Sequence, residues 1–219
     1  MNILFKTGQV ERWLESARSG SEKGLAVFLD QGMDIDSAGL WGGTALMAAA
    51  SGDHGGCVSF LLANRACHRQ KSMKGETALM WAANGKSVGC LSLLIEAGAE
   101  LDVGDKSGDN AAMMAARRGA AECLRALVAA GADLGALNVH GQTAAMMAAV
   151  KGNLESLWVL VDAGVDMAAR DLDGCSAMDW AKMSGKTDCM ILIRSHLEQK
   201  ELSALTAGKE SKSAAGLRI

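Results

Sequence analysis

The chain has 219 residues, of which 49% are hydrophobic, 21% are charged and 4% are aromatic. Its formal net charge of −3 provides neither the basic surface typical of nucleic-acid-binding proteins nor a strong attraction to an anionic membrane. No run of residues approaches the roughly 18 consecutive apolar residues that a membrane-spanning helix needs. These properties argue against nucleic acid as a partner and against insertion into a membrane.

Residues of the same type recur along the chain with a period of 33 residues. One column holds Gly42, Gly75, Gly108, Gly141 and Gly174. A second column holds Gly20, Asp53, Lys86, Gly119, Gly152 and Gly185, and a third holds Cys57, Cys90, Cys123 and Cys189. A period of this length is typical of a solenoid, in which each repeat buries its apolar face only against its neighbours. We therefore expect one elongated body with a continuous core.

Within one period, Gly75–Ser107, the pattern predicts a turn followed by two helices. Thr77 is placed to cap the first helix, because its hydroxyl can accept a backbone N–H from the first turn. We expect this helix to end at Gly85, with the glycine supplying the positive φ that stops it. Apolar residues at helical spacing predict a second helix from Val88 to Ala97. Residues 99–108, rich in Gly and Asp, suit a turn or short hairpin.

The fourth repeat carries a set of residues that is matched comparably in the others. They are Asp105, Gly108, Ala115, Ala116, Gly119, Leu124, Leu127, Gly131, Ala132 and Asp133. This pattern resembles the ankyrin repeat, whose motif runs Asp-x-x-Gly-x-Thr-Pro-Leu-His-x-Ala-Ala-x-x-Gly, then an apolar helix, then Gly-Ala-Asp. The resemblance covers about residues 9–196. It implies an all-α solenoid of about six helix-turn-helix repeats with short hairpin connections, whose function is to bind proteins.

The expected solenoid occupies residues 1–196 and is followed by an extension, residues 197–219. The six repeats lie at about residues 9–41, 42–74, 75–107, 108–140, 141–173 and 174–196.

Two columns depart from the ankyrin motif. The proline of the motif is replaced by Ala45, Ala78, Ala111, Ala144 and Ala177. The histidine is replaced by Met47, Met80, Met113 and Met146. We expect the hydrogen bonds that the motif's imidazole makes to the neighbouring turn to be missing, with thioether packing in their place.

The two ends of the predicted stack differ from its middle. Residues 1–20 place Trp13 and Leu14 on the buried face of a first helix, and their acidic residues argue against a mitochondrial presequence. No clear targeting signal is present, and the segment is interpreted as a diverged first repeat. In the sixth repeat, Asp179 and Lys182 replace the Met and Ala of other repeats, as is typical of a terminal capping repeat.

One loop breaks the pattern within the stack. Arg65 occupies the column in which other repeats end their second helix with glycine, at Gly32, Gly98, Gly131 and Gly164. A non-glycine residue in a left-handed conformation costs about 1 kcal/mol. We therefore expect the loop at Arg65 to be distorted or mobile.

The repeat register is lost after about Leu197. The composition of residues 197–219 favours a disordered tail, because the segment is small, polar and nearly balanced in charge. The spacing of Leu197, Leu202 and Leu205 also allows a helix that orders on a partner.

Four of the six cysteines occupy a core column that the ankyrin family fills with Val or Ile, so we expect them to act as small hydrophobic residues. Successive layers of packed helices lie about 10 Å apart, whereas a disulfide needs Cα atoms within about 7 Å. Reduced thiols indicate the cytoplasm or another reducing compartment.

The sequence predicts no metal site, no cofactor and no enzyme. His54, Cys57, Cys67 and His68 come closest to a metal-binding set, but Cys57 should point into the core and no C-x-x-C pair exists. The four histidines are scattered over different repeats, and neither a G-x-S-x-G motif nor a phosphate-binding glycine loop is present.

The strongest candidate for a binding surface is the row of turn tips, which occupy two columns. They hold Leu40 and Trp41, Met73 and Lys74, Lys106 and Ser107, Val139 and His140, and Leu172 and Asp173. Isolated exposed apolar residues are common on any protein, but four of the five residues in the first column are apolar and aligned. Such a row, with a tryptophan at one end, is typical of an interface core.

Further candidates lie on the helices. Arg117 and Arg118 end the first helix of the fourth repeat, where they either contact a partner or complement the helix dipole. Trp158 is expected on the convex back, where it is either a hot-spot residue or a cover for its neighbours. Trp81 and Trp180 share an inner column with two methionines and are interpreted as stacking core.

The sequence therefore favours a protein-binding module that uses its turn tips and concave face. One version is a permanent structural subunit of a multi-subunit complex. The alternative is a transient adaptor or inhibitor that occludes a partner enzyme. The near absence of charge at the tips favours the first version, a permanent structural subunit.

Overall fold

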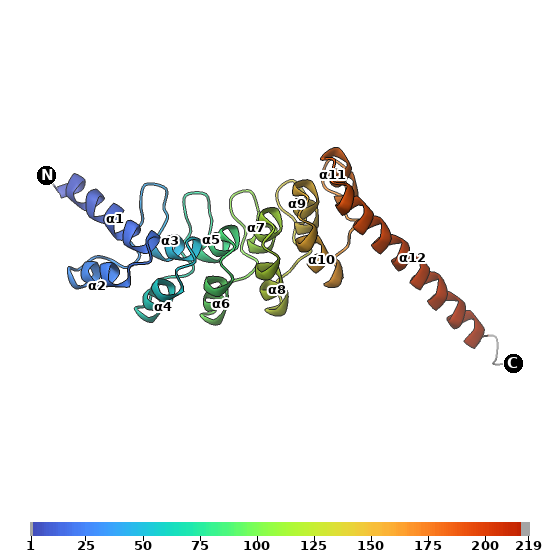
Figure 1. Cartoon of the computed structure of the whole chain (residues 1–219), viewed down its shortest axis with the longest axis horizontal. Coiled ribbons are helices and arrows are strands. Elements are labelled where there is room, and N and C mark those ends of the chain that lie inside the picture. The colour runs from blue at the N-terminus through green and yellow to red at the C-terminus, as the bar shows by residue number, and fades with distance from the viewer. Residues whose placement is uncertain (1, 216–219) are drawn as a thin grey trace.

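The computed structural model describes the backbone of residues 2–215 and, within it, the side chains of residues 8–204. The described residues form twelve α-helices and no β-strand, apart from one isolated bridge between Ala38 and Thr44. The helices pair in chain order into a single elongated row, with α1 and α12 at opposite ends (Figure 1). The all-α solenoid expected from the period is confirmed.

Two parallel rows of helices build the stack (Figure 1). The inner row consists of α1 (Asn2–Arg18), α3 (Ala45–Ser51), α5 (Ala78–Gly85), α7 (Ala111–Arg118), α9 (Ala144–Lys151) and α11 (Ala177–Met183). The outer row consists of α2 (Glu22–Asp30), α4 (Gly55–Ala63), α6 (Val88–Glu96), α8 (Ala121–Ala129), α10 (Leu154–Asp162) and α12 (Thr187–Ala215). Long hairpin loops connect each outer helix to the next inner helix and project to one side of the stack.

The inner helices begin at a repeated cap. Thr44, Thr77, Asn110, Thr143 and Ser176 each precede an inner helix, and the side chain of each accepts the backbone N–H three residues further on. This bond satisfies a donor that has no partner within the helix. The predicted N-cap column is therefore confirmed.

The methionine column makes hydrogen bonds that the sequence analysis did not anticipate. The sulfur of Met80 lies 3.4 Å from the backbone nitrogen of Thr77, and the sulfur of Met146 lies 3.5 Å from that of Thr143. In each pair the threonine N–H donates to the thioether while its hydroxyl accepts from the methionine N–H. Because sulfur is a weak acceptor and both bonds lie within one repeat, they add to the expected thioether packing of the buried methionines.

Gly85 has a different role from the one predicted. The residue with positive φ after α5 is Lys86, at φ 62°, and its whole column shares this conformation. Gly85 instead lies against the backbone of α3, where a Cβ would come within 2.4 Å of the Ser51 carbonyl oxygen. The glycine is needed for close helix packing and not for helix termination.

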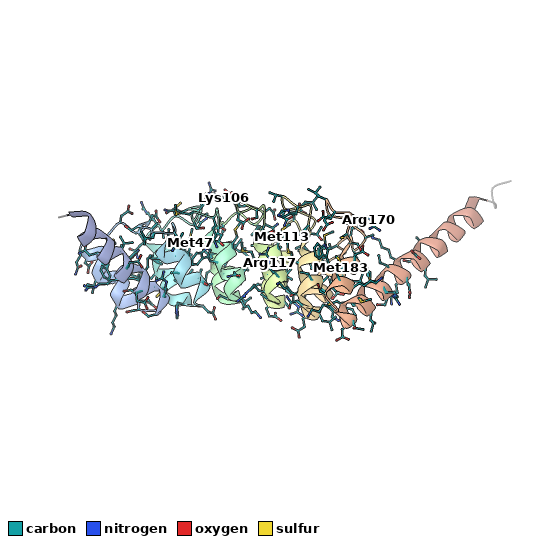
Figure 2. All side chains as sticks on the ribbon, turned by 90° about the horizontal axis from the view of Figure 1, so that it is seen from above. Met47, Lys106, Met113, Arg117, Arg170 and Met183 are labelled. Carbon is teal, nitrogen blue, oxygen red and sulfur yellow. The ribbon has the colours of Figure 1, made fainter. Side chains whose placement is uncertain are left out.

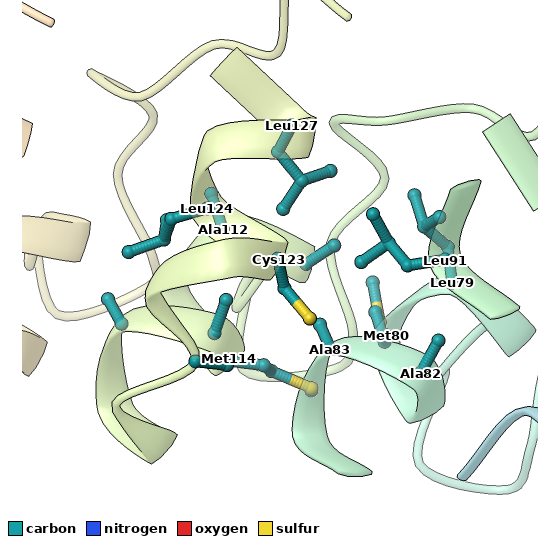
Figure 3. Packing of buried hydrophobic residues seen from close by; sticks show 14 of the residues in the cluster. Leu79, Met80, Ala82, Ala83, Leu91, Ala112, Met114, Cys123, Leu124 and Leu127 are labelled. Carbon is teal, nitrogen blue, oxygen red and sulfur yellow. The ribbon is translucent and has the colours of Figure 1, made fainter. Parts of the chain in front are cut away.

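Small side chains let the inner helices approach one another. Ala82, Ala83, Ala115 and Ala116 are fully buried, and larger residues such as Leu91 and Leu124 fill the space between the two rows. Figure 3 shows this packing between the third and fourth helix pairs, where Cys123 points towards Ala83. The four cysteines of the periodic column are all buried and unpaired, as expected for small hydrophobic residues.

The loop at Arg65 is regular, contrary to expectation. Arg65 has φ 67°, in the same left-handed region as Gly98 at φ 81°. The N–H of Ala66 donates to the Leu61 carbonyl at 2.9 Å, as the N–H of Ala99 does to that of Leu94 at 3.0 Å. The arginine adopts the glycine conformation because these hydrogen bonds hold the loop.

Both ends of the stack are covered by longer helices. Trp13 and Leu14 of α1 are buried, as predicted. At the other end α12 continues past the repeat register to Ala215, with Leu197 packed against the core and Leu202 63% exposed. Residues 216–219 and the side chain of Leu205 lie outside the described part of the chain. No helix within residues 2–215 has the length and hydrophobicity required to cross a membrane.

Candidate protein-binding surface

Four of the five hairpins are held in shape by one side chain near the base, whereas the first hairpin has Gly39 at this position. Asp105 accepts the backbone N–H groups of Ser107 at 2.8 Å and Asp109 at 3.0 Å through one carboxylate oxygen. Ser72, Asn138 and Asp171 make the same pair of bonds in their own hairpins. These bonds fix the turn without a strand ladder, so the tips have a defined geometry.

Backbone hydrogen bonds then connect each tip to the next. The N–H of Met73 donates to the carbonyl of Trp41 at 2.9 Å, and the N–H of Lys106 donates to that of Lys74 at 2.9 Å. The remaining two are Val139 to Ser107 at 2.9 Å and Leu172 to His140 at 3.0 Å. The two predicted tip columns are thus brought together in one continuous row.

The side chains of this row are open to water. Leu40, Trp41 and Leu172 are 78–79% exposed, and Met73 and Val139 are 60% and 56% exposed. Lys74, Lys106, Ser107, His140 and Asp173 are also exposed. Lys106 projects from the hairpin edge of the molecule (Figure 2). We refer to these ten residues, which form an apolar row with polar neighbours, as the tip row.

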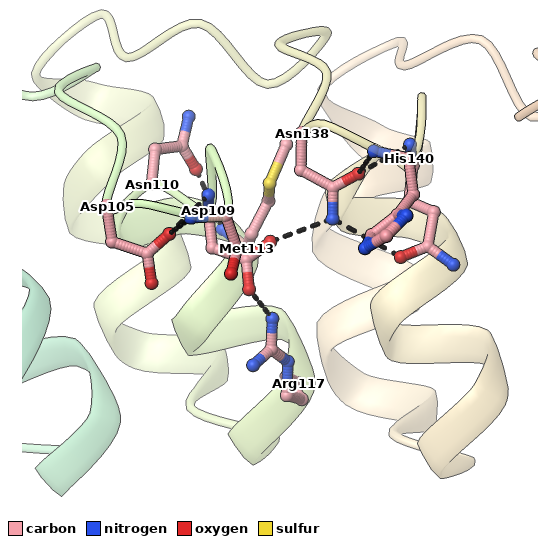
Figure 4. Close-up of polar contacts among 9 residues, drawn as sticks. Asp105, Asp109, Asn110, Met113, Arg117, Asn138 and His140 are labelled. Atoms are coloured by element: carbon pink, nitrogen blue, oxygen red, sulfur yellow. Dashed lines mark hydrogen bonds and ion pairs between the residues drawn. The ribbon is translucent and has the colours of Figure 1, made fainter. Parts of the chain in front are cut away.

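Arg117 and Arg118 have partners within the chain. The guanidinium of Arg117 is paired with Asp109, which also accepts a hydrogen bond from Asn138 at 2.9 Å (Figure 4). Arg118 donates to the carbonyl of Asn84 at 3.1 Å, at the C-terminal end of the neighbouring helix α5. Arg118 therefore complements the negative end of an adjacent helix and not that of its own.

Trp158 lies apart from the tip row. It is 50% exposed on α10, in the outer row of helices, while the hairpins project from the other side of the stack (Figure 1). The structure therefore presents Trp158 as a separate exposed aromatic residue.

A cavity that the sequence pattern did not reveal lies between the first and second hairpins. It has a volume of about 410 Å³ and is lined by Trp41, Ser72, Met73, Lys74, Glu76 and Trp81. Trp81 is only partly buried, and its indole N–H donates to the Glu76 carboxylate at 3.1 Å. Trp180 has an equivalent bond to Asp171 at 2.8 Å. The available signal was the column itself, in which Trp81 and Trp180 replace the Ala48, Met114 and Met147 of other repeats.

The set of residues considered for metal binding does not converge. His54 lies 2.6 Å from the Arg18 carbonyl through Nε2, Cys57 is buried and Cys67 is exposed. Among the side chains of residues 8–204 no group of three His, Cys, Asp or Glu is placed to hold an ion. Burial raises the pKa of Cys90 to about 12 and that of Cys123 to about 11, with Asp53 adding to both shifts. These two thiols are therefore protonated at neutral pH.

Comparison with known proteins identifies the family. A family model for ankyrin repeats (3 copies) matches residues 14–105, 84–171 and 112–203. The chain belongs to the ankyrin repeat family. This ankyrin repeat protein shares its fold with 555 chains of solved structures, so the fold alone does not identify a partner. No curated protein sequence matches it.

One solved structure is similar over most of its length. It is the Bd0816 predatory endopeptidase from Bdellovibrio bacteriovorus in complex with the immunity protein Bd3460. The matched chain is 27% identical with a TM-score of 0.74, and the match covers 84% of this ankyrin repeat protein and 97% of that chain.

Proposed function

We propose that this protein binds a partner protein through the tip row and acts by occluding it. The observation that carries the proposal is the alignment of exposed apolar side chains on a rigid hairpin edge. A row of this kind is unfavourable in water, and burying it against a second protein removes that cost. The backbone hydrogen bonds between tips hold the hairpins in place before binding, so little backbone entropy is lost in the complex.

The mode of action is suggested by the similar structure. That structure contains an endopeptidase in complex with an immunity protein. It therefore supports the idea that a protein with this fold binds a partner enzyme. We therefore add inhibition of a partner enzyme to the protein binding that the ankyrin family implies. The comparison supports the mode of action and does not name the partner.

A second candidate is a permanent structural subunit. The near absence of charge from the first tip column supports it, because obligate interfaces are more apolar than transient ones. The two candidates differ in solution behaviour. A permanent subunit elutes from gentle purification in a stoichiometric complex, whereas an inhibitor is a monodisperse monomer when its partner is absent.

The test uses a triple variant of the tip row. We expect L40S, M73S and L172S together to weaken binding of the co-purified partner by about 100-fold or more, because buried apolar anchors contribute about 1 kcal/mol or more each. The matched control is I191S, which changes an apolar residue that is 63% exposed on α12. Partner affinity is measured by titration calorimetry, and folding of each variant by circular dichroism.

Two results would refute the proposal. Unchanged affinity in the folded triple variant would exclude the tip row as the binding surface. Full activity of a partner enzyme in the saturated complex would exclude occlusion and leave the structural subunit as the candidate.

A further inference from the structure

We propose that the cavity between the first and second hairpins binds a large apolar side chain from an acidic segment of the partner, and that carboxylates of this segment contact Lys74 and Lys106. The inference rests on the proposed function, because it names the chemistry of the partner at one part of the tip row. The cavity, its polar bonds and the local charge each support it.

The walls of the cavity come from two adjacent hairpins and one inner helix. Trp41 is at the tip of one hairpin, Met73 and Lys74 are at the tip of the next, and Trp81 lies on α5 at the base of that hairpin. The volume of about 410 Å³ lies within the range of pockets that bind organic groups. Two indole rings and a thioether present surfaces that favour an aromatic or large aliphatic side chain.

The polar groups of Ser72, Glu76 and Trp81 in the walls already have partners. The Glu76 carboxylate accepts from the Trp81 indole at 3.1 Å and from the Ser72 hydroxyl at 3.0 Å. The side chain that enters therefore does not need to provide an acceptor for the Trp81 N–H. The same bonds hold the ring in place, which lowers the entropy cost of binding.

The indole of Trp81 is also left uncovered by the preceding hairpin. Gly43 lies beside it, and a Cβ at that position would be 3.4 Å from the ring atom Cη2. Because Gly43 has no side chain, this part of the Trp81 ring remains open to a side chain that enters the cavity. Trp81 is therefore both a packing residue of the inner row and a wall of the cavity.

One lysine lines the cavity, and a second lies on the hairpin next to it. Lys74 and Lys106 lie on adjacent hairpins that are joined by the Lys106–Lys74 backbone bond of 2.9 Å, and Lys71 is exposed nearby in the sequence. Neither Lys74 nor Lys106 forms an ion pair with another described residue. The one carboxylate of the lining, Glu76, is engaged with Trp81 and Ser72.

This local charge is opposite to that of the whole chain. The net charge is −3, and acidic residues concentrate near the ends of outer helices and in the loops that follow them, as at Asp30, Asp34, Asp36, Glu96, Glu100 and Asp102. Two unpaired lysines on an acidic protein attract acidic segments and disfavour basic ones. An apolar side chain flanked by Asp or Glu therefore complements both the cavity and these lysines.

The test is a selection of short random-sequence peptides displayed on phage against the full chain. We expect the recovered peptides to contain a large apolar residue next to Asp or Glu. Their dissociation constants are then measured by fluorescence polarisation with synthetic peptides at several salt concentrations.

Two variants and their matched controls separate the contributions of the cavity and the two lysines. We expect W41A to weaken binding by about 10-fold or more, as for a hot-spot tryptophan, while W158A has no effect. We expect the pair K74E and K106E to slow association and reduce its salt dependence, while K23E and K200E do not. Trp41 is 79% exposed, so its replacement leaves the fold intact.

Several outcomes would overturn the inference. They are recovery of basic peptides, recovery of no peptides, binding that is insensitive to W41A, and self-association of the chain that W41A abolishes. Each of these leaves the proposed function standing if the triple tip variant still loses its cellular partner. The proposed function fails separately if that triple variant retains the partner.

Discussion

The close approach of α5 to α3 positions Trp81 in the cavity, and Gly85 on the same helix provides a direct test of it. A Cβ at Gly85 would lie 2.4 Å from the Ser51 carbonyl oxygen and 3.0 Å from both Cα and C of Ser51. All three are backbone atoms, so no rotamer change can relieve the contact. The G85A variant must therefore separate the two helices or distort one of them.

The expected magnitude follows from two opposing effects. Alanine at a helical position is favoured over glycine by at most about 1 kcal/mol. Overpacking against a rigid neighbour costs about 1–3 kcal/mol. Since Gly85 is the last residue of α5, the helix-forming gain is small, and we expect a net loss of about 1–2 kcal/mol.

Gly89 provides the matched control. It lies in α6, and a Cβ there would have no atom within 4 Å, so G89A has the favourable effect without the clash. We expect G89A to raise the stability by about 0.5 kcal/mol. Urea unfolding followed by far-UV circular dichroism measures the free energy of unfolding of both variants. A loss of about 1 kcal/mol corresponds to a fall in Tm of about 2–4 °C. If G85A is stabilised as much as G89A, the described approach of α3 and α5 is wrong.

Three further predictions concern the backbone and the thiols. K86G should raise the free energy of unfolding in urea by about 0.5–1 kcal/mol, because Lys86 adopts the left-handed conformation at φ 62° that glycine favours. A loss of stability would show that the contacts of the lysine side chain outweigh the backbone strain at this position. Ellman's reagent should label Cys67 and Cys175 in the folded protein and the other four cysteines only after unfolding, since those four are buried; rapid labelling of all six would contradict the packing. Because burial raises the pKa of Cys90 from 9.0 to about 12, the unfolded thiol loses its proton first, so stability should fall as pH rises from about 9 towards 12. The C90V variant lacks this contribution, and an unchanged difference in unfolding free energy between it and the wild type over that range would refute the shift.

The column structure of the repeat was readable from the sequence because helix caps and core positions depend on local spacing. The Thr, Asn and Ser caps and the buried cysteines all lie where the 33-residue period placed them. The tip row was also predicted, from the period together with the resemblance to the ankyrin repeat, since hairpins in register bring equivalent residues side by side. The binding role assigned to that row remains a prediction.

Contacts between repeats could not be derived in this way. The restriction at Gly85 comes from Ser51 on the preceding inner helix, and the bonds to the Met80 and Met146 sulfurs depend on the side chains' orientation. The bond from Arg118 to the Asn84 carbonyl also joins two repeats, so the pattern of a single repeat did not reveal it. In each case the sequence shows the type of the residue. It does not show a contact with a residue 34 positions away, or a side-chain orientation that packing determines.

The sequence by itself determined the family, the helical solenoid and the row of exposed tips, because these follow from periodicity and short-range preferences. The tertiary structure alone decided that Trp81 reaches the surface beside Trp41. It also decided that Lys74 lines the cavity and that Lys106 lies on the adjacent hairpin, neither of them in an ion pair with another described residue. The physical reason is that a cavity is a property of the space between repeats. That space depends on how closely neighbouring helices approach, which the composition of a single repeat does not specify.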